Sequence, residues 1–255
     1  MIGALGMYDF PWLAAANDAI WTALGGTRLD RSRPLAAIWA DPDLTLAQTC
    51  GWPLMTAHPG LQVVVTPTYD LPGCDGAWHC SLIVVADDSP AASLADVRGS
   101  RAAINGRDSN TGMNLLRAAV APVAGGRAFF GSVGVTGAHL NSLAAVAARA
   151  ADVAAIDCVT HGLIARHRPD LLAGTRVLAR TPMSPGLPLV TAAGTAPATL
   201  AALRDALRGL FEDSRTARPR AALGWTGMAA VPKAAYARVL DLADEARALG
   251  MDALK

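Results

Sequence analysis

Between Ala103 and Asn114 the sequence reads Ala-Ile-Asn-Gly-Arg-Asp-Ser-Asn-Thr-Gly-Met-Asn. The apolar residues before Asn105 are typical of the end of a strand, and a polar, glycine-containing loop follows them. Ser109 is a suitable N-cap, because its hydroxyl can accept a hydrogen bond from a backbone N–H of the first helical turn. The stretch therefore predicts a strand, a turn and a helix over residues 109–120, a unit typical of an α/β fold.

The same order of elements repeats along the chain. We expect strands at residues 101–105, 132–136, 152–156 and 176–179, and helices at residues 109–120, 138–149 and 159–166. This alternation indicates parallel strands joined by crossover helices. The run Ser81-Leu-Ile-Val-Val-Ala86 predicts a further strand that is buried on both faces.

The pattern changes on both sides of this segment. Strands are expected at residues 2–7, 61–66 and 189–192, and helices at residues 11–24, 198–211, 216–223 and 234–249. We therefore predict two α/β lobes. Residues 1–86 and 188–255 would form a discontinuous first lobe, and residues 87–187 would form the second.

Composition excludes several classes of protein. The 255 residues are 52% hydrophobic and carry 22 basic and 21 acidic side chains, for a formal net charge of +1. A chain so apolar and so weakly charged is folded rather than disordered. It lacks the basic surface that a nucleic-acid backbone requires, and only Lys233 and Lys255 are lysines. Every long uncharged stretch is interrupted by proline, glycine or polar groups, so no transmembrane helix is expected.

Four cysteines are too few for a disulfide-dense scaffold. Cys74 and Cys80 enclose five residues and could close a small loop, or both could be free thiols. Without a CxxC pair or a clustered Cys/His pattern, we expect neither a metal site nor a cofactor. There is no GxSxG, Walker or GxGxxG motif, and we predict no catalytic residue.

The turn at Ser109, Asn110 and Thr111 is the first candidate ligand-binding feature. Hydroxyl groups, backbone N–H groups and the positive end of a helix dipole converge at such a helix start, which makes it suited to an anion. The alternative is ordinary helix capping.

Two further candidates follow the next strands. His139 stands where a strand passes into a helix, at the edge where ligands bind in open α/β sheets. Asp157 ends the strand that follows. A carboxylate accepts hydrogen bonds only, so it would favour an oxyanion that carries a proton over fully ionised sulfate. A structural role for His139 and capping of the next helix by Asp157 are the alternatives.

These residues belong to an ordered series of motifs that resembles the phosphate, phosphite and phosphonate receptors of bacterial ABC importers. The series is Ser93-Leu-Ala-Asp-Val-Arg-Gly99, Ala103-Ile-Asn-Gly106, Ser109-Asn-Thr-Gly112, Thr136-Gly-Ala-His139, Ser142-Leu-Ala-Ala-Val146, Ala151-Asp-Val-Ala-Ala155, Pro185-Gly-Leu-Pro188 and Leu223-Gly-Trp225. The resemblance implies the two-lobe type 2 periplasmic-binding-protein fold of the α/β class, with a small oxyanion in the cleft between the lobes.

The resemblance also implies residue roles. Ser109, Asn110 and Thr111 would grip the phosphoryl oxygens and His139 would contact the ligand, while Tyr8 and Thr49 would belong to the first-lobe wall. Trp78 or His79 would lie near the mouth of the cleft. Receptors for amino-substituted phosphonates carry an acidic residue where Leu187 stands here, so an ammonium-bearing ligand is not expected.

We therefore expect a monomeric binding protein, not an enzyme, that serves an ABC permease or a sensing role. The alternative is a small cytosolic enzyme on the same fold, of the menaquinone or thiamine-precursor type, with Asp157, His139 and Cys158 as its candidate groups. The start of the sequence, Met-Ile-Gly-Ala-Leu-Gly-Met, lacks the pattern of an export signal. The resemblance implies the periplasm, and the start of the sequence leaves the cytoplasm open.

Overall fold

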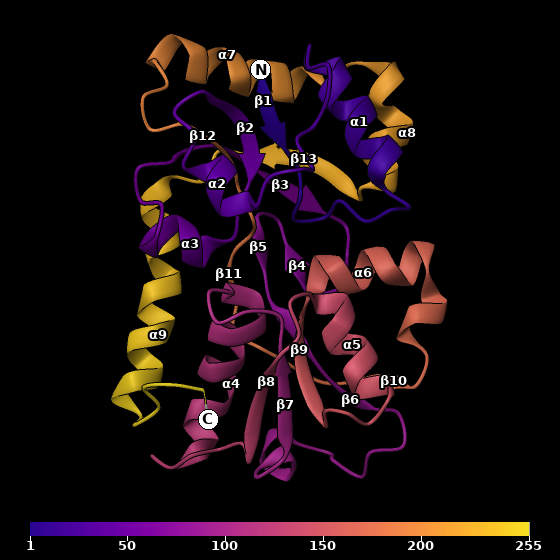
Figure 1. The fold of residues 1–255 in the computed structure, drawn as a ribbon, viewed down its shortest axis with the longest axis vertical. Coiled ribbons are helices and arrows are strands. Elements are labelled where there is room, and N and C mark those ends of the chain that lie inside the picture. Colours follow the sequence, from indigo (N-terminus) through magenta and orange to yellow (C-terminus); the bar gives the residue numbers. More distant parts are fainter. Residues whose placement is uncertain (255) are drawn as a thin grey trace. The chain divides into compact units, whose positions relative to one another are not determined.

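The computed structural model describes residues 1–254, and their contacts divide the chain into two compact units (Figure 1). The first unit contains residues 1–70, 75–77 and 185–236. The second contains residues 71–74, 78–184 and 237–254. Within residues 1–254, no helix has both the length and the apolar character needed to cross a bilayer.

The first unit is an α/β structure around a five-stranded sheet. Its elements are β1 (Ile2–Ala4), α1 (Ala14–Ala23), α2 (Leu35–Trp39), β2 (Leu44–Gln48), α3 (Gly51–Thr56), β3 (Gln62–Tyr69), β12 (Leu189–Thr191), α7 (Pro197–Gly209), α8 (Ala217–Ala222) and β13 (Trp225–Ala229), with short 3-10 turns at Ser214–Thr216 and, at its end, Lys233–Ala237. The strand order is β1-β2-β12-β3-β13. Strand β12 returns from far along the sequence and pairs antiparallel with both β2 and β3.

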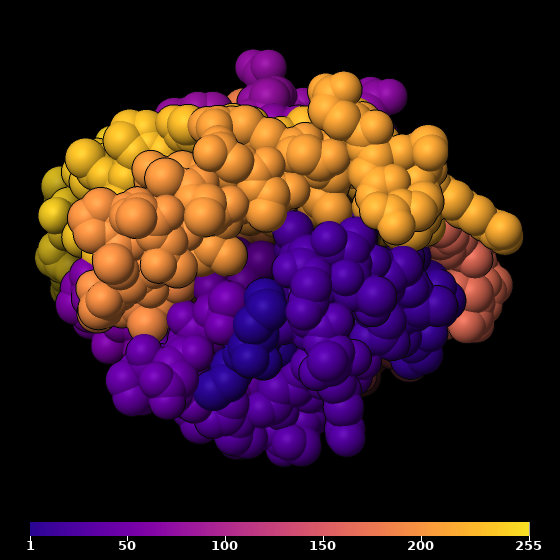
Figure 2. Space-filling view, turned by 90° about the horizontal axis from the view of Figure 1, so that it is seen from above, coloured from indigo at the N-terminus to yellow at the C-terminus, as the bar shows by residue number. Residues whose placement is uncertain are grey.

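Apolar side chains from both halves of the first unit form its core. The buried cluster includes Ile38, Leu44, Leu54, Val63, Val190 and Tyr236. Helix α1 packs against α8. Figure 2 shows one face of this unit, where the orange atoms of α7 and α8 adjoin the indigo atoms of the N-terminal segment.

The second unit is built on another five-stranded sheet. Its elements are β6 (Ser81–Ala86), a 3-10 turn (Leu94–Val97), β7 (Arg101–Ile104), a π-type turn (Asn110–Asn114), α4 (Leu115–Ala124), β8 (Ser132–Val135), α5 (His139–Ala147), β9 (Val153–Asp157), α6 (Cys158–His167), a 3-10 turn (Pro169–Leu172), β10 (Thr175–Arg180) and α9 (Arg238–Ala248). The strand order is β10-β6-β9-β7-β8. Short strands β4 (Cys74–Asp75), β5 (Trp78–His79) and β11 (Ser184–Pro185) form a third sheet at the points where the chain passes between the units.

The strands of the second sheet do not all run in the same direction. Strand β7 pairs parallel with β8 and with β9, whereas β6 pairs antiparallel with β9 and with β10. The four strands that the sequence predicted to be parallel therefore run in one direction. Strand β6 is inserted between β9 and β10 and runs the opposite way.

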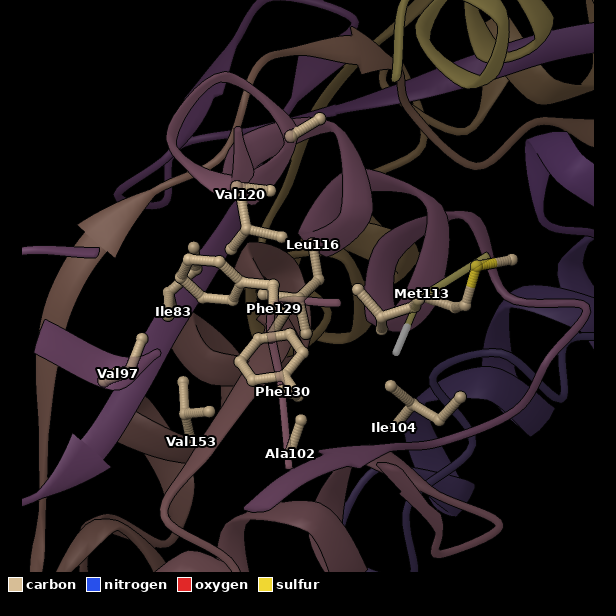
Figure 3. Close-up of a cluster of buried hydrophobic side chains, with 14 of the residues drawn as sticks. Ile83, Val97, Ala102, Ile104, Met113, Leu116, Val120, Phe129, Phe130 and Val153 are labelled. Atoms are coloured by element: carbon tan, nitrogen blue, oxygen red, sulfur yellow. The ribbon is translucent and has the colours of Figure 1, made fainter. Parts of the chain in front are cut away.

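Helices cover both faces of this sheet. Helices α4 and α9 lie on one side, and α5 and α6 lie on the other (Figure 1). The core between the sheet and α4 contains Ile83, Ile104, Leu116, Val120 and Phe129, all of them almost completely buried (Figure 3). The edge-to-face pair of Phe129 and Phe130, with ring centroids 4.9 Å apart, fills the same layer.

The observed units differ from the predicted lobes at three elements. Strand β5 was expected in the first lobe and belongs to the second unit. Strand β6 was expected in the first lobe, but it pairs with β9 and β10 and belongs to the second unit. Helix α9 was also expected in the first lobe, but it packs on α4 and belongs to the second unit. The sequence reading also missed β13, a short strand whose glycine and small residues give a weak apolar alternation.

Candidate functional site

Four segments of the second unit meet at one edge of its sheet. Strands β7, β8 and β9 are parallel, so their carboxyl ends share an edge. The loops after β7 and β8 begin at Asn105 and Thr136, and β9 ends at Asp157, directly before α6. Because β6 runs the opposite way, its first residue Ser81 lies beside Asp157 at the same edge. This topology brings residues 79–81, 109–111, 139 and 157 into one region.

The turn that starts at Ser109 is tightly built. The Ser109 hydroxyl accepts a hydrogen bond from the Gly112 N–H at 2.9 Å, and the Asn114 N–H donates to the Ser109 carbonyl at 3.1 Å, which is the i→i+5 pattern of a π-turn. A Cβ at Gly112 would lie 1.8 Å from Asn105 Oδ1. Capping by Ser109 is therefore present, and the glycine lets the turn sit directly against the end of β7. Single π-turns are frequent at functional sites.

Thr111 and His139 make direct contact. Thr111 Oγ1 lies 3.0 Å from His139 Nε2, although the loops that carry them follow different strands. His139 is the first residue of α5, and the N-cap position Ala138 offers no side-chain cap to the helix. Burial lowers the pKa of His139, and the negative charge of Asp157 opposes that change. A neutral imidazole and a hydroxyl thus stand together at two helix starts.

Asn110 is held inside the second unit. Its side chain donates to Ser184 Oγ at 2.9 Å and accepts from Asn114 Nδ2 at 3.0 Å. The Ser81 hydroxyl donates to the Thr111 carbonyl at 2.8 Å. Ser81 and Ser184 were not among the predicted site residues, since single serines in apolar segments give no sequence signal.

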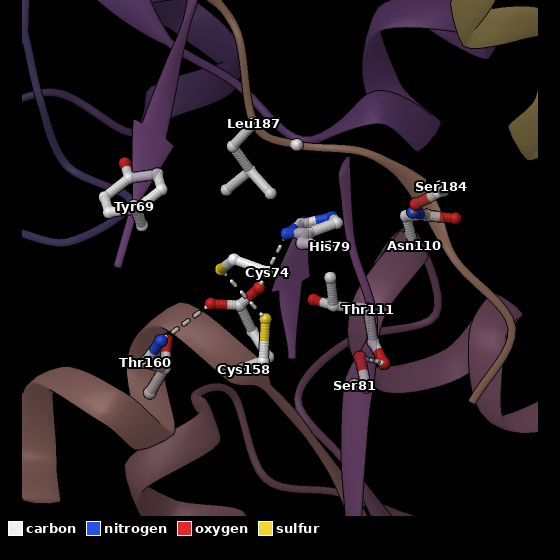
Figure 4. A network of polar contacts seen from close by, with 12 residues as sticks. Tyr69, Cys74, His79, Ser81, Asn110, Thr111, Cys158, Thr160, Ser184 and Leu187 are labelled. Carbon is white, nitrogen blue, oxygen red and sulfur yellow. Dashed lines mark hydrogen bonds and ion pairs between the residues drawn. The ribbon is translucent and has the colours of Figure 1, made fainter. Parts of the chain in front are cut away.

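The two carboxylate oxygens of Asp157 have different neighbours. Its Oδ2 accepts a hydrogen bond of 2.8 Å from the Thr160 N–H, so Asp157 caps α6. Its Oδ1 lies 3.2 Å from His79 Nδ1, and both side chains are only 2% exposed (Figure 4). Burial raises the pKa of Asp157, but His79, His139 and the Thr160 N–H outweigh this effect and hold the pKa below its usual value.

Three cysteines lie next to Asp157. Cys74 Sγ is 3.5 Å from Cys158 Sγ (Figure 4), and Cys74, Cys80 and Cys158 are thiols that form no disulfide. The contacts with Cys74 and burial keep the pKa of Cys158 above its usual value. A contact with Cys158 and burial do the same for Cys80. The spacing of Cys74 and Cys80 suggested a pair, and the structure adds Cys158 as a partner of both.

Tyr8 and Thr49 lie in the first unit. The buried Tyr8 ring makes an edge contact with Tyr69, with centroids 6.0 Å apart. Thr49 is fully buried, its N–H donates to the Pro188 carbonyl at 3.1 Å, and its hydroxyl donates to the Cys50 carbonyl at 3.3 Å. Their predicted contact with a ligand stays a prediction.

Of the predicted site residues, the structure brings Ser109, Asn110, Thr111, His139 and Asp157 to one edge of the second sheet. From the sequence, His79 was predicted only as one of two residues, with Trp78, near the mouth of a cleft. The contact between His79 and Asp157 was not predicted, because it depends on the antiparallel pairing of β6 with β9, which places the residues before Ser81 beside Asp157.

Comparison with known proteins agrees with this fold. The family model of periplasmic substrate-binding proteins of phosphonate ABC transporters matches residues 41–236, which is more than half of the chain. A search among curated proteins finds no match.

Solved structures with the same fold cover nearly the whole chain. PhnD1 from Prochlorococcus marinus, in complex with methylphosphonate, is 14% identical with a TM-score of 0.78, over 96% of this chain and 97% of that one. A binding-protein component of an ABC phosphonate transporter from Pseudomonas aeruginosa is 17% identical with a TM-score of 0.76, over 97% of this chain and 86% of that one. A chloride-bound protein from Xanthomonas citri is 17% identical with a TM-score of 0.68, over 97% of each chain.

At such low identities these structures establish the fold alone, and they confirm the predicted two-lobe α/β class of periplasmic binding proteins. The family follows from the match of the family model over residues 41–236. It also confirms the resemblance that the ordered motifs carried. The chain belongs to the family of periplasmic substrate-binding proteins of phosphonate ABC transporters.

Proposed function

We propose that the protein binds a small phosphorus oxyanion, such as phosphate, phosphite or a phosphonate, at the edge of the second sheet. Ser109, Asn110 and Thr111 would offer hydroxyl and backbone donors, His139 would offer its imidazole, and Asp157 would accept a hydrogen bond from a protonated oxygen of the ligand. The observation that carries the proposal is the 3.0 Å contact between Thr111 Oγ1 and His139 Nε2. It unites two helix starts that each favour an anion.

Neutral donors suit this ligand class. Negative charge at a helix N-terminus gains about 0.3–1 kcal/mol at exposed sites and up to about 2 kcal/mol when partly buried. Two such helix starts, together with hydroxyl donors, can hold an anion without a lysine. The negative charge of Asp157 would repel a fully ionised sulfate and accept a hydrogen bond from a protonated phosphorus oxyanion.

We further propose that the protein acts by binding rather than catalysis, as a monomer that delivers its ligand to an ABC permease. Family membership supports the transport role, and the PhnD1 relative that binds methylphosphonate supports the ligand class. The enzyme alternative would need a reacting group at the site, and it predicts turnover of the bound compound. Recovery of an unchanged oxyanion after long incubation would argue against that alternative.

A thermal-shift screen tests the ligand. Phosphate, phosphite, methylphosphonate and sulfate are added separately to chelator-treated protein. A ligand at about 100 times its Kd should stabilise the protein by about 2.7 kcal/mol. We expect this for at least one phosphorus oxyanion and not for sulfate. If none of them raises the melting temperature, the proposed function is wrong.

The double variant Ser109→Ala with Thr111→Val tests the site. We expect it to lose the ligand-induced shift, because both hydroxyls disappear while the backbone stays. Ser132→Ala with Thr56→Val makes the same chemical changes at two exposed positions and should keep the shift. Equal affinity in the two double variants would place the site elsewhere.

A further inference from the structure

A buried cluster of potential metal ligands lies beside the proposed oxyanion site. His79, Asp157 and Cys158 are all buried, and their nitrogen, oxygen and sulfur ligand atoms lie within 4.8 Å of one another. They come from β5, the end of β9 and the start of α6. The spacing in sequence, 79 to 157, is too wide to give a metal motif, which is why the sequence predicted no metal site.

His79 and Asp157 lie close together, but their geometry is not that of a well-aligned hydrogen-bonded pair. His79 is 2% exposed, yet neither ring nitrogen has a well-aligned hydrogen-bond partner. Asp157 Oδ1 is equally buried and has no such partner, although His79 Nδ1 is 3.2 Å away. The two atoms are close but not aligned as donor and acceptor. Two ligand atoms that point toward one ion between them have this arrangement.

The thiol of Cys74 lies beside this cluster, next to Cys158. Cys74 Sγ lies 3.5 Å from Cys158 Sγ, close to the separation of two sulfurs on one tetrahedral zinc, whose Zn–S bonds are about 2.3 Å. Cys74 is half-buried and gives an incoming ion a route to the cluster. Gly73 has a φ of +101°, and a Cβ there would lie 2.7 Å from Cys158 Cβ and 3.0 Å from Cys80 Sγ. Glycine thus leaves room for the sulfur atoms.

We propose that Cys158, His79 and Asp157 form a binding site for a zinc-type divalent cation, and that the neighbouring Cys74 moves in as its fourth ligand. Thiolate, imidazole and carboxylate are the three ligand types that Zn²⁺ takes in proteins, and four ligands make a closed tetrahedral site. Binding would release the two thiol protons to solvent, while His79 binds as a neutral ring. Cys80 stays a thiol against Cys158. The site goes beyond the proposed oxyanion function and shares only Asp157 with it.

Metal titration tests this proposal on the full-length protein, reduced and stripped with a chelator, in a buffer without phosphate. We expect Zn²⁺ to bind at one ion per chain in competition with a chromophoric chelator. Co²⁺ should give the visible bands of a tetrahedral site together with a thiolate-to-cobalt charge-transfer band. Absence of that charge-transfer band in the wild-type protein would overturn the proposal without any variant.

Variants then assign the ligands. Cys158→Ser and His79→Ala should weaken Zn²⁺ binding by more than the about 10–100-fold that loss of an outer-shell partner causes. Cys50→Ser, at a buried cysteine of the first unit, is the control and should bind normally. Cys74→Ser changes a half-buried position and replaces Cys158→Ser if that variant does not fold.

Unchanged Zn²⁺ affinity in Cys158→Ser and Cys74→Ser would contradict the assignment. So would a reduced protein that binds no metal and loses two hydrogens from its intact mass on exposure to air, provided that peptide mapping then finds Cys74 joined to Cys158, because that result makes the two residues a disulfide pair. Since the oxyanion screen uses chelator-treated protein, its result does not depend on the outcome of the metal titration.

Discussion

At the scale of single residues, backbone space at the proposed site is as important as the side chains that face it. Gly112 lies in the π-type turn after Ser109, and its N–H is bonded to the Ser109 hydroxyl. A Cβ at this position would meet Asn105 Oδ1 at 1.8 Å and the Asn105 backbone nitrogen at 3.3 Å. The sequence motif marked the polar residues, but only the structure shows why the glycine between them is needed.

We therefore expect Gly112→Ala to destabilise the protein by about 1–3 kcal/mol, the usual cost of overpacking a buried position. Affinity for the oxyanion should fall as well, because the turn must move away from β7. Urea unfolding and the thermal-shift titration measure the two effects. Gly209→Ala in α7 is the control, since no atom lies within 4 Å of its added Cβ. Alanine there should be neutral or stabilising by up to about 1 kcal/mol, and equal costs at the two positions would refute the steric argument.

His161 on α6 makes the free energy of unfolding depend on pH, and this effect can be tested separately. Burial lowers its pKa in the folded state below the usual value of about 6.5. As the pH falls through about 6.5, the unfolded chain takes up a proton that the folded protein still resists. The free energy of unfolding must then decrease until the lower, folded-state pKa is passed.

His161→Gln removes this contribution. Compared with wild type, we expect the variant to lose less stability between about pH 7.5 and about pH 5.5, as measured by urea midpoints at both pH values. Identical losses in the two proteins would mean that His161 titrates equally in the folded and unfolded states.

At the scale of elements, Asn114 ties the site turn to two helices of the second unit. Its Nδ2 donates to Asn110 Oδ1 at 3.0 Å and to the Val239 carbonyl of α9 at 2.9 Å. Its Oδ1 accepts from Arg117 of α4 at 3.0 Å. The residue is fully buried, and its loss would remove one hydrogen bond from each of these groups.

Asn114→Ala should therefore cost about 1–3 kcal/mol or more, because it leaves buried polar groups without this partner. The free energy of unfolding from urea titration measures the cost. Asn141→Ala is the matched control: its side chain donates to the Thr136 carbonyl at 2.8 Å but lies at an exposed position, where water replaces it. If both variants lose the same small amount, the bridge does not hold α9 to the turn.

The helices and strands of the second unit show which features could be predicted from the sequence. The run Ser81–Ala86 was placed with its observed bounds, and the helix starts at Ser109 and His139 were placed within a residue, because capping and apolar runs are local signals. The assignment of β6 and α9 to the second unit depends on long-range pairing, which a local pattern does not contain. For the same reason Asp157 was predicted to bind the oxyanion, while its contact with His79 was not predicted.

At the scale of the whole molecule, the balance of charges constrains how the ligand is attracted. With 22 basic and 21 acidic side chains the net charge is +1, and many arginines are engaged in surface ion pairs, such as Arg101 with Asp152 and Arg31 with Asp9. Such a surface gives little long-range steering of an anion. The proposed site attracts it by hydrogen bonds and helix dipoles, which act within the first turn of each helix.

Oxyanion affinity should consequently depend weakly on ionic strength. Raising sodium chloride from about 50 mM to about 500 mM shortens the screening length severalfold, but the binding contacts here are short and partly buried. We expect the Kd of the best oxyanion from the screen to change by less than about threefold, because little of its binding depends on distant charges. Isothermal titration calorimetry at both salt concentrations measures it. A tenfold or larger loss would mean that arginine charges attract the ligand and that neutral donors are not its main partners.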